Sequence, residues 1–440
     1  MRLVNVKTKV LEEFLEGTVP PYAILSHTWG ADHEEVLFHD IRAHDSTQSL
    51  RSRKFEGCCD QAALDGYGYV RIDTCCIDKD SSTELTEAIN SMFRWYKDAN
   101  VCYAYLSDVS VGDGPLELDS MLSRSRWFTR GWTLQELIAP KVVRLYDNEW
   151  ACLGTKRELA HVLVGITGIP RPFLLGMASL RDSSVAQRMS WAAKRITKRK
   201  EDMAYCLLGI FDISMPMIYG ECDRAFFRLQ EYILRHIRDD SILAWGFNVE
   251  NIKSTGALAR SPSDFLACGT IVSSALDYGS YEPIQIVGGR LQFRRPLHTL
   301  ESDQTFIVLL CRLSNNAAQP LGMPFCESRS AGFVDGHERP QGTSVTLLDA
   351  NAIDDKPGDI KMSIEPREDS RLSEELPGFY IDNTLERSLR VAEVDPSALW
   401  NRETDMVVPV MQNHGNPLQR TCIRFRQIGV MSKPADILVI

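Results

Sequence analysis

Short apolar runs alternate with amphipathic stretches along the N-terminal part of the chain, to about residue 150. The apolar runs predict buried strands at residues 22–29, 68–77, 100–109 and 141–147. Between them, residues 51–66 and the stretch after Ser81 carry apolar residues at helical spacing, and Ser81 with Glu84 forms a capping-box motif. A further helix is predicted at residues 132–139, where Pro140 ends it. Alternating strands and helices are typical of a parallel sheet, so the pattern indicates an α/β domain.

The pattern changes twice farther along the chain. Residues 151–240 are predicted to be helical, with two helices that break near residues 197–200 and a longer helix at residues 223–240. After residue 241, short strand-like runs are separated by Gly, Pro, Asn and Asp, which is typical of an all-β sandwich or barrel. We therefore expect a domain at residues 1–240, with an α/β core to about residue 150 and a helical layer after it. A β-rich domain of unknown role is expected at residues 241–440.

Composition narrows the class of protein. The chain of 440 residues has a formal net charge of -10, with 49 basic and 59 acidic residues, which argues against a nucleic-acid partner. No apolar run is long enough to span a membrane, and the N-terminus lacks the apolar core of a secretory signal. We therefore expect a cytoplasmic protein whose 12 cysteines are mostly reduced, buried, small apolar side chains. Their spacing does not indicate a metal site.

Polar residues follow the predicted strands, at the edge where ligands bind in open parallel sheets. They are Ser26, His27, Thr28, Trp29 and Gly30 at the end of the first strand, Asp73 on the second, and Ser107 and Asp108 at the end of the third. The sequence contains no glycine-rich dinucleotide loop, phosphate-binding loop, nucleophile elbow or zinc-binding His-Glu-x-x-His helix. The strand-end residues are thus the candidates for a site.

The helix at residues 132–139 combines an indole with a carboxylate. Trp132 and Glu136 are four residues apart and therefore share a helical face. A carboxylate beside an aromatic ring suits glycosidic cleavage, because it stabilises an oxocarbenium-like transition state. Apolar neighbours would also raise the pKa of such a carboxyl group. The alternative is that Glu136 faces solvent, on a helix that packs through its leucine and tryptophan side chains.

The strand-end residues also have simpler interpretations. His27 could be satisfied by a backbone group, and Asp73 could cap the next helix or bond within its own turn. Trp29 and Trp127 are interpreted as core residues rather than as stacking platforms. Lying together at one edge, these residues favour a site more than any of them does singly.

Several long motifs closely resemble the fungal heterokaryon-incompatibility (HET) domain. They are "PYAILSHTWG", "GYVRIDTCCIDKDSSTELTEAINSMFRWYKDANVCYAYLSDV", "SRWFTRGWTLQELIAP", "SVAQRMSWAAKRITKRKEDMAYCLLGIFDISMPMIYGE" and "RLQEYI". They occur in order and cover most of the chain from Met1 to about Trp245. The resemblance implies a role in fungal non-self recognition, where incompatible fusion triggers cell death.

The order of elements also resembles, more distantly, a TIR domain. Enzymatic TIR domains carry a Trp-to-Glu-Leu motif whose glutamate cleaves NAD, and Trp132, Glu136 and Leu137 have that spacing. Thr133 stands where the family usually has Cys, and Arg130 where it has Ser. Ser125-Arg126-Trp127 matches the Ser-x-Trp half of the motif instead. The alignment therefore leaves open which of Trp127 and Trp132 corresponds to the tryptophan of the motif.

The TIR resemblance implies a TIR-like parallel sheet with flanking helices and a site for NAD as a substrate, with no cofactor. Glu136 would be catalytic, and Trp132 would stack on a ring. The residues His27, Trp29, Gly30, Asp73 and Arg130 would bind substrate. The alternative function is a non-enzymatic module that self-associates on activation by an unknown protein trigger and so signals cell death.

Overall fold

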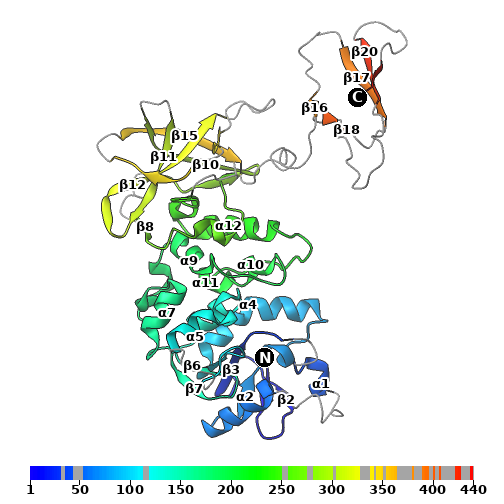
Figure 1. Cartoon of the computed structure of the whole chain (residues 1–440), viewed down its shortest axis with the longest axis vertical. Coiled ribbons are helices and arrows are strands. Elements are labelled where there is room, and N and C mark those ends of the chain that lie inside the picture. Colours follow the sequence, from blue (N-terminus) through cyan, green and yellow to red (C-terminus); the bar gives the residue numbers. More distant parts are fainter. Residues whose placement is uncertain are drawn as a thin grey trace. The chain divides into compact units, whose positions relative to one another are not determined.

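The structure is a computed structural model of the chain. It describes residues 1–30, 35–42, 53–111, 118–249, 256–274, 281–300, 304–327, 337–340, 343–349 and 353–363, and the backbone of six short strands beyond residue 363. The chain divides into two compact units, Met1–Glu365 and Pro366–Ile440 (Figure 1). No described helix has the length and apolar character needed to cross a membrane.

A seven-stranded mixed sheet forms the N-terminal part of the first unit, in the order β2-β1-β4-β3-β5-β6-β7. Its strands are β1 (Arg2–Asn5), β2 (Leu11–Glu13), β3 (Tyr22–His27), β4 (Tyr69–Arg71), β5 (Val101–Tyr105), β6 (Val143–Tyr146) and β7 (Cys152–Thr155). The four predicted strands are the central β3 to β6, and they pair in parallel. The sheet is not parallel throughout, because β1, β2 and β7 pair antiparallel at its edges.

Strand β4 ends earlier than the predicted run at residues 68–77. After Arg71 the chain turns into the short helix α3 (Asp73–Cys76), in which the Cys76 amide donates to the Ile72 carbonyl at 2.8 Å. A short apolar run does not distinguish a strand from a buried helical turn, which explains the misassignment. As a result, Asp73 begins a helix at the carboxyl end of β4.

Helices flank the sheet. They are α1 (Phe38–Arg42), α2 (Arg53–Leu64), α4 (Ser82–Asp98), α5 (Leu118–Arg124) and α6 (Thr133–Ile138), with the 3-10 turn η3 (Arg126–Thr129) before α6. Three of these helices, α2, α4 and α6, lie at the predicted places, whereas α1 and α5 were not predicted. Ser81 caps α4, because its hydroxyl accepts from the Glu84 amide at 3.3 Å. The Glu84 carboxylate accepts from the Asp78 amide and from Arg2 rather than completing the capping box.

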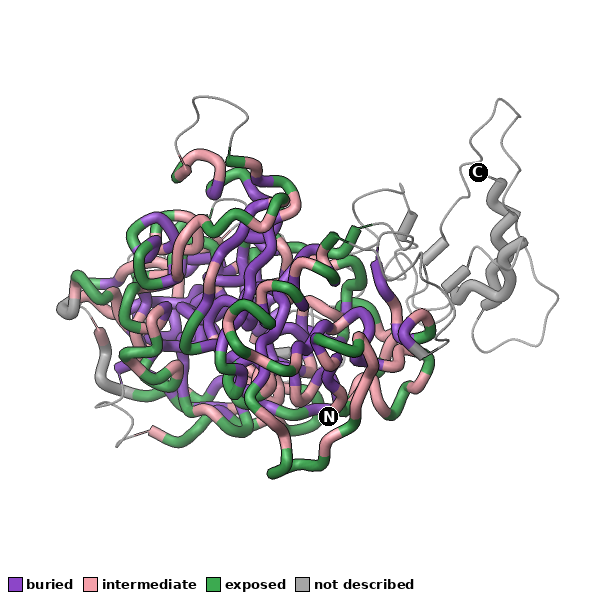
Figure 2. Tube along the Cα trace, turned by 90° about the horizontal axis from the view of Figure 1, so that it is seen from below, coloured by how far each residue is buried: buried purple, intermediate pink, exposed green. Residues whose placement is uncertain are grey.

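A helical layer follows the sheet. Its helices are α7 (Ala160–Thr167), α8 (Arg171–Leu174), α9 (Val185–Ala192), α10 (Asp202–Tyr205), α11 (Leu208–Phe211) and α12 (Arg224–His236). The gap between α9 and α10 contains the predicted break, and α12 is the predicted long helix. One hydrophobic cluster continues from Leu3 through these helices to Met362. Figure 2 shows the buried residues in the interior of the trace and the exposed residues on its outside.

A second sheet completes the first unit and closes into a barrel-like ring. Its strands are β8 (Ile271–Ser273), β9 (Gln285–Val287), β10 (Arg290–Thr299), β11 (Thr305–Leu313), β12 (Asn316–Glu327), β13 (His337–Glu338), β14 (Thr346–Leu347) and β15 (Asp354–Ser363). The ring closes because β12 pairs with β11 as well as with β13 and β14. The expected change from helical to β-rich structure is confirmed.

The second unit also contains strands. They are β16 (Phe379–Tyr380), β17 (Leu389–Asp395), β18 (Trp400–Asn401), β19 (Met406–Val407), β20 (Cys422–Gln427) and β21 (Ile437–Val439), in two three-stranded sheets. The sequence also predicts a domain boundary between residues 240 and 241. That residues 241–440 form a separate domain stays a prediction.

A buried ion pair joins the end of the helical layer to the ring. Asp240 begins the 3-10 turn η5 (Asp240–Leu243), and its carboxylate accepts from Arg295 of β10 at 2.6 and 2.7 Å. Both side chains are at most 2% exposed. Removing one partner of such a pair leaves an uncompensated buried charge.

We expect Asp240→Asn to lower the free energy of unfolding by about 3–5 kcal/mol, because Arg295 then stays buried without its counter-charge. Chemical denaturation of the full chain measures the loss. The matched control is Asp359→Asn, which breaks the exposed pair of Asp359 with the neighbouring Arg294 and should cost less than about 1 kcal/mol. Equal losses in the two variants would contradict a stabilising role for the buried pair.

Candidate functional site

The carboxyl group of Glu136 lies inside the protein. All six residues of α6 are buried, and Glu136 is 7% exposed. Its Oε2 accepts a hydrogen bond of 2.5 Å from the Ser26 hydroxyl, whose oxygen accepts from Trp127 Nε1 at 2.9 Å. Ser26 therefore links the carboxyl group to a fully buried indole. This burial excludes the solvent-facing interpretation of Glu136.

Burial determines the protonation of Glu136. Loss of solvent, followed by the nearby charge of Asp73, raises the pKa of Glu136 to about 8. The hydrogen bond from Ser26, the nearby hydroxyl group of Tyr96 and the positive charge of Arg195 oppose this rise. The carboxyl group is therefore largely protonated at neutral pH, and small changes in its surroundings would ionise it.

A second carboxyl group in the same region has the opposite character. His27, the last residue of β3, places its Nε2 3.4 Å from Glu35 Oε2 and its Nδ1 3.8 Å from Asp73 Oδ1. Burial by itself would raise the pKa of Glu35, but His27, the Lys54 ammonium group and the Gly30 amide together lower that pKa to about 2. Glu35 therefore remains ionised where Glu136 holds its proton.

The side chain of Trp29 is exposed beside these groups, and we call it the rim of the candidate site. Its side chain is 44% exposed, and its Nε1 donates to Asp73 Oδ2 at 3.0 Å. The Lys79 ammonium group lies 3.4 Å from the centre of the Trp29 ring, a cation–π contact. The interpretation of Trp29 as a core residue is therefore wrong, because the chain leaves the sheet after His27 and carries the indole outward. Trp127, by contrast, is a core residue.

The structure places the expected site residues in two groups. Around the carboxyl ends of β3 and β4 lie His27, Trp29 and Asp73, with Gly30 joined to them because its amide donates to Glu35 at 2.7 Å. The charge of Asp73 also acts on Glu136, which connects α6 to this group.

Trp132 and Arg130 contact the helical layer. Trp132 is half-buried and lies beside the Asp202 side chain, and the Arg130 carbonyl accepts from Arg195 at 2.8 Å. The indole connected to Glu136 through described hydrogen bonds is therefore that of Trp127. The substrate-binding roles expected for Trp132 and Arg130 stay predictions.

Arg195 was missed in the sequence. It is 4% exposed, and its Nη1 donates to the Thr133 hydroxyl at 2.9 Å, which holds the first residue of α6. Burial lowers the pKa of Arg195 to about 10, and its charge acts on Glu136. No motif marks it, since its partner Thr133 lies 62 positions earlier. Ser26 was among the strand-end candidates, whereas Glu35 was missed and had only the weak signal of being close in sequence to His27.

Both ends of α6 are held tightly. At the C-terminal end, Lys156 donates to the carbonyls of Leu137 and Pro140 at 3.0 and 2.7 Å, and burial lowers the pKa of Lys156 to about 8. At the N-terminal end, a Cβ atom on Gly131 would come within 2.5 Å of the Thr197 side chain. Glu136 is therefore presented from a short but rigid helix.

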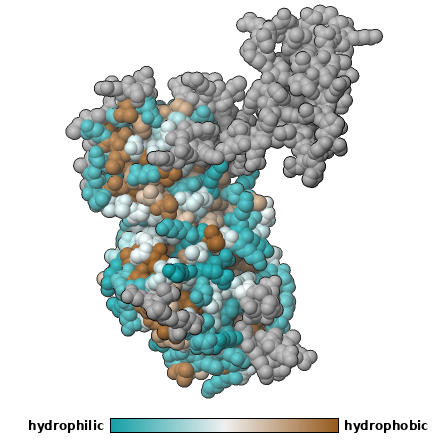
Figure 3. All heavy atoms as spheres, viewed as in Figure 1, coloured by the Kyte–Doolittle hydropathy of each residue, from teal (hydrophilic) through white to brown (hydrophobic). Residues whose placement is uncertain are grey.

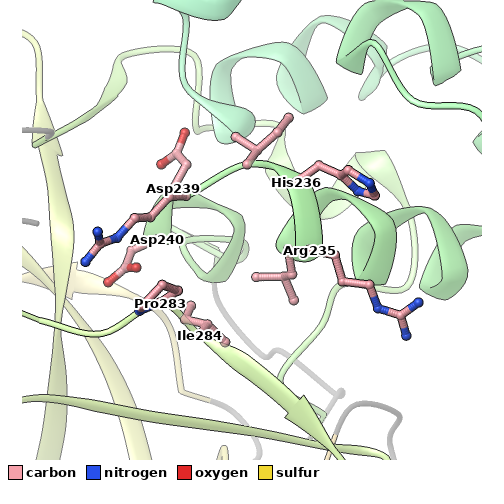
Figure 4. A pocket seen from close by; sticks show the side chains of 9 residues that line it. Arg235, His236, Asp239, Asp240, Pro283 and Ile284 are labelled. Atoms are coloured by element: carbon pink, nitrogen blue, oxygen red, sulfur yellow. The ribbon is translucent and has the colours of Figure 1, made fainter.

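A small pocket elsewhere lies between the end of α12 and the strand β9. It has a volume of about 150 Å³, and Figure 4 shows Asp239 and Asp240 on one side and Arg235 and His236 on the other. Asp239 accepts from the amides of Val185 and Ser241, and Asp240 binds Arg295. Because ligand pockets usually have volumes of about 300–1,000 Å³, this pocket is too small for a dinucleotide.

Comparisons with known proteins follow the same segments. Residues 22–124 match the family described as heterokaryon incompatibility protein (HET), and residues 224–277 match a domain of unknown function, DUF8212. The chain is 50% identical over 233 residues to the vegetative incompatibility protein HET-E-1 of Podospora anserina. That alignment covers 52% of this chain but 17% of the relative's length. No solved structure matches the chain.

The matched family is the one that the sequence motifs resemble. The matched range contains β3, β4 and the residues His27, Trp29, Gly30 and Asp73. Glu136 and Trp127 follow directly after the matched range. Residues 22–124 therefore carry a HET domain, and the N-terminal half of the chain is similar to a fungal vegetative incompatibility protein.

Proposed function

We propose that the chain acts in fungal non-self recognition as a cell-death effector and that its HET domain cleaves NAD at the bond between nicotinamide and ribose. The recognition role is supported by the match to the HET family and by the similarity to a vegetative incompatibility protein. The enzymatic role is supported by the site around Glu136 and by the resemblance to TIR domains.

The observation that carries the enzymatic proposal is the buried carboxyl group of Glu136. None of the ion pairs among the described residues includes it, and burial raises its pKa to about 8. A glutamine at position 136 could accept the same hydrogen bond from Ser26 without the free-energy cost of burying an ionisable group. Strongly perturbed carboxyl groups at the ligand edge of a sheet are typical of catalytic sites.

The proposed chemistry uses the charged form of Glu136. Cleavage of a ribosyl bond produces a cationic, oxocarbenium-like transition state, which a carboxylate beside the ribose stabilises. Ser26 and Trp127 hold the carboxylate in place, and Asp73 adds a second negative charge. The exposed ring of Trp29 offers a stacking surface for a flat base. Because Glu136 is 7% exposed, we infer that substrate reaches it after the pair of Trp29 and Asp73 moves aside.

A self-associating module is the rival function. The face drawn in Figure 3 carries several separate hydrophobic patches among hydrophilic residues, so this view does not favour one large docking surface among the described residues. The two functions differ in whether the chemistry of Glu136 is needed.

Glu136→Gln should lower the rate of nicotinamide release from NAD by about 10²–10³, because one preorganised stabilising group is lost. In the wild-type chain the rate should rise with pH toward about 8, as Glu136 ionises. Nicotinamide release by purified full chain, followed chromatographically, measures both effects. Glu13→Gln, at an exposed residue of β2, is the matched control.

Expression of the same two variants in fungal cells tests the death response. Loss of death with Glu136→Gln but not with Glu13→Gln supports the enzyme. Full death with a folded Glu136→Gln variant, or wild-type protein that leaves NAD intact, would favour the self-associating module.

The stability of Glu136→Gln should depend on pH in a defined direction. Above about pH 4.5 the unfolded chain loses a proton that the folded chain keeps up to about pH 8, so wild-type stability falls as pH rises through this window. The variant lacks this loss and should gain, relative to wild type, a few kcal/mol between pH 5 and 8, an order of magnitude that follows from the size of the pKa shift. Thermal melting at several pH values measures the gain. A constant difference between variant and wild type would show that Glu136 titrates as an ordinary carboxyl group.

A further inference from the structure

Three side chains near the rim could together bind a metal ion. His39 lies on α1, and Asp78 and Asp80 lie in the loop between α3 and α4. One ligand atom from each of the three lies within 4.8 Å of the others, and His39 Nε2 is 2.8 Å from Asp80 Oδ2. We propose that His39, Asp78 and Asp80 form a binding site for a divalent transition-metal ion.

The donor set decides the class of ion. One imidazole nitrogen and two carboxylates suit Mn²⁺, Fe²⁺ or Zn²⁺, whereas Mg²⁺ and Ca²⁺ prefer sites made only of oxygen atoms. Two carboxylates at this spacing repel each other, and a dication would remove that repulsion. The side chains of His39 and Asp80 are 70% and 80% exposed, which leaves coordination positions open to water or to a ligand.

The surrounding contacts already orient the loop. The Asp80 amide donates to Asp78 Oδ1 at 3.1 Å, and the Asp78 amide donates to Glu84 at 2.9 Å. Glu84 is engaged by that amide and by Arg2, so it is not counted among the ligands. The metal would therefore bind a turn whose backbone is held from the start of α4.

The same loop reaches the rim of the candidate site. Lys79, between the two aspartates, contacts the face of Trp29, which in turn bonds Asp73. An ion held by Asp78 and Asp80 would fix the backbone that carries Lys79, and so would steady the rim residue Trp29. The site stands independently of NAD cleavage, since ion binding is measured without any substrate.

Binding of Mn²⁺ to the full chain tests the proposal. Mn²⁺ is the probe because the exposed thiols of Cys152, Cys222 and Cys326 would compete for Zn²⁺. Electron paramagnetic resonance of the free ion should show one Mn²⁺ bound per chain. His39→Ala and Asp80→Asn should each weaken Mn²⁺ binding by at least about tenfold. Even the loss of a group that only hydrogen-bonds to a metal ligand lowers metal affinity by about 10- to 100-fold.

His161→Ala is the matched control, because His161 is an equally exposed histidine beside a single aspartate, Asp119. It should leave Mn²⁺ binding unchanged. Thermal melting of each variant checks the fold, which should be preserved because the changed side chains are exposed. No stoichiometric binding up to about 1 mM, the weak end of protein cation sites, would overturn the proposal. Binding that is equal in wild type, His39→Ala and Asp80→Asn would also overturn it.

Discussion

The hydrogen bond between Ser26 and the buried carboxyl group of Glu136 is the constraint on which the candidate site depends. It joins the end of the central strand β3 to helix α6, and Trp127 extends the connection into the core. A carboxyl group is costly to bury, so its position must be secured by the residues around it. Lys156 and the close packing at Gly131 serve this purpose at the two ends of α6.

Two carboxyl groups near the ends of the central strands differ in protonation because their partners differ. Glu35 has His27, Lys54 and the Gly30 amide around it, and these hold its pKa near 2. Glu136 is buried, with the hydroxyl group of Ser26 and the like charge of Asp73 near it, and its pKa rises to about 8. Such separation of two carboxyl groups is how a single site can present both a fixed negative charge and a group that gains and loses a proton.

The site is assembled across more of the chain than the segment that matches the HET family. Ser26, His27 and Asp73 lie within residues 22–124, while Trp127 and Glu136 follow them. Arg195 comes from the helical layer, where Ile196 pairs with Arg130 beside it. The helical layer is therefore part of the architecture that holds α6, and the ring of strands is joined to that layer by Asp240 and Arg295.

Elements with strong periodic patterns could be predicted from the sequence. The central strands β3, β5 and β6 are mostly apolar runs, and α4 and α12 show helical spacing over 17 and 13 residues. Strands β1 and β2, on one side of the sheet, were missed because they are 4 and 3 residues long. Strand β15 was missed as well, since its residues, DDKPGDIKMS, are mostly polar and it is defined by its pairing with β10.

The sequence by itself determined that Glu136 sits on a helix next to tryptophans and near polar strand ends. It did not determine which way the carboxyl group faces, because a helix of 6 residues whose side chains are all buried has no polar face to read. The tertiary structure decided that Glu136 points to Ser26, that Trp127 is the indole joined to it, and that Arg195 is its nearby positive charge. The reason is physical: the pKa of a carboxyl group depends on solvent exclusion and on charges a few ångströms away, and these neighbours come from segments far apart in the chain.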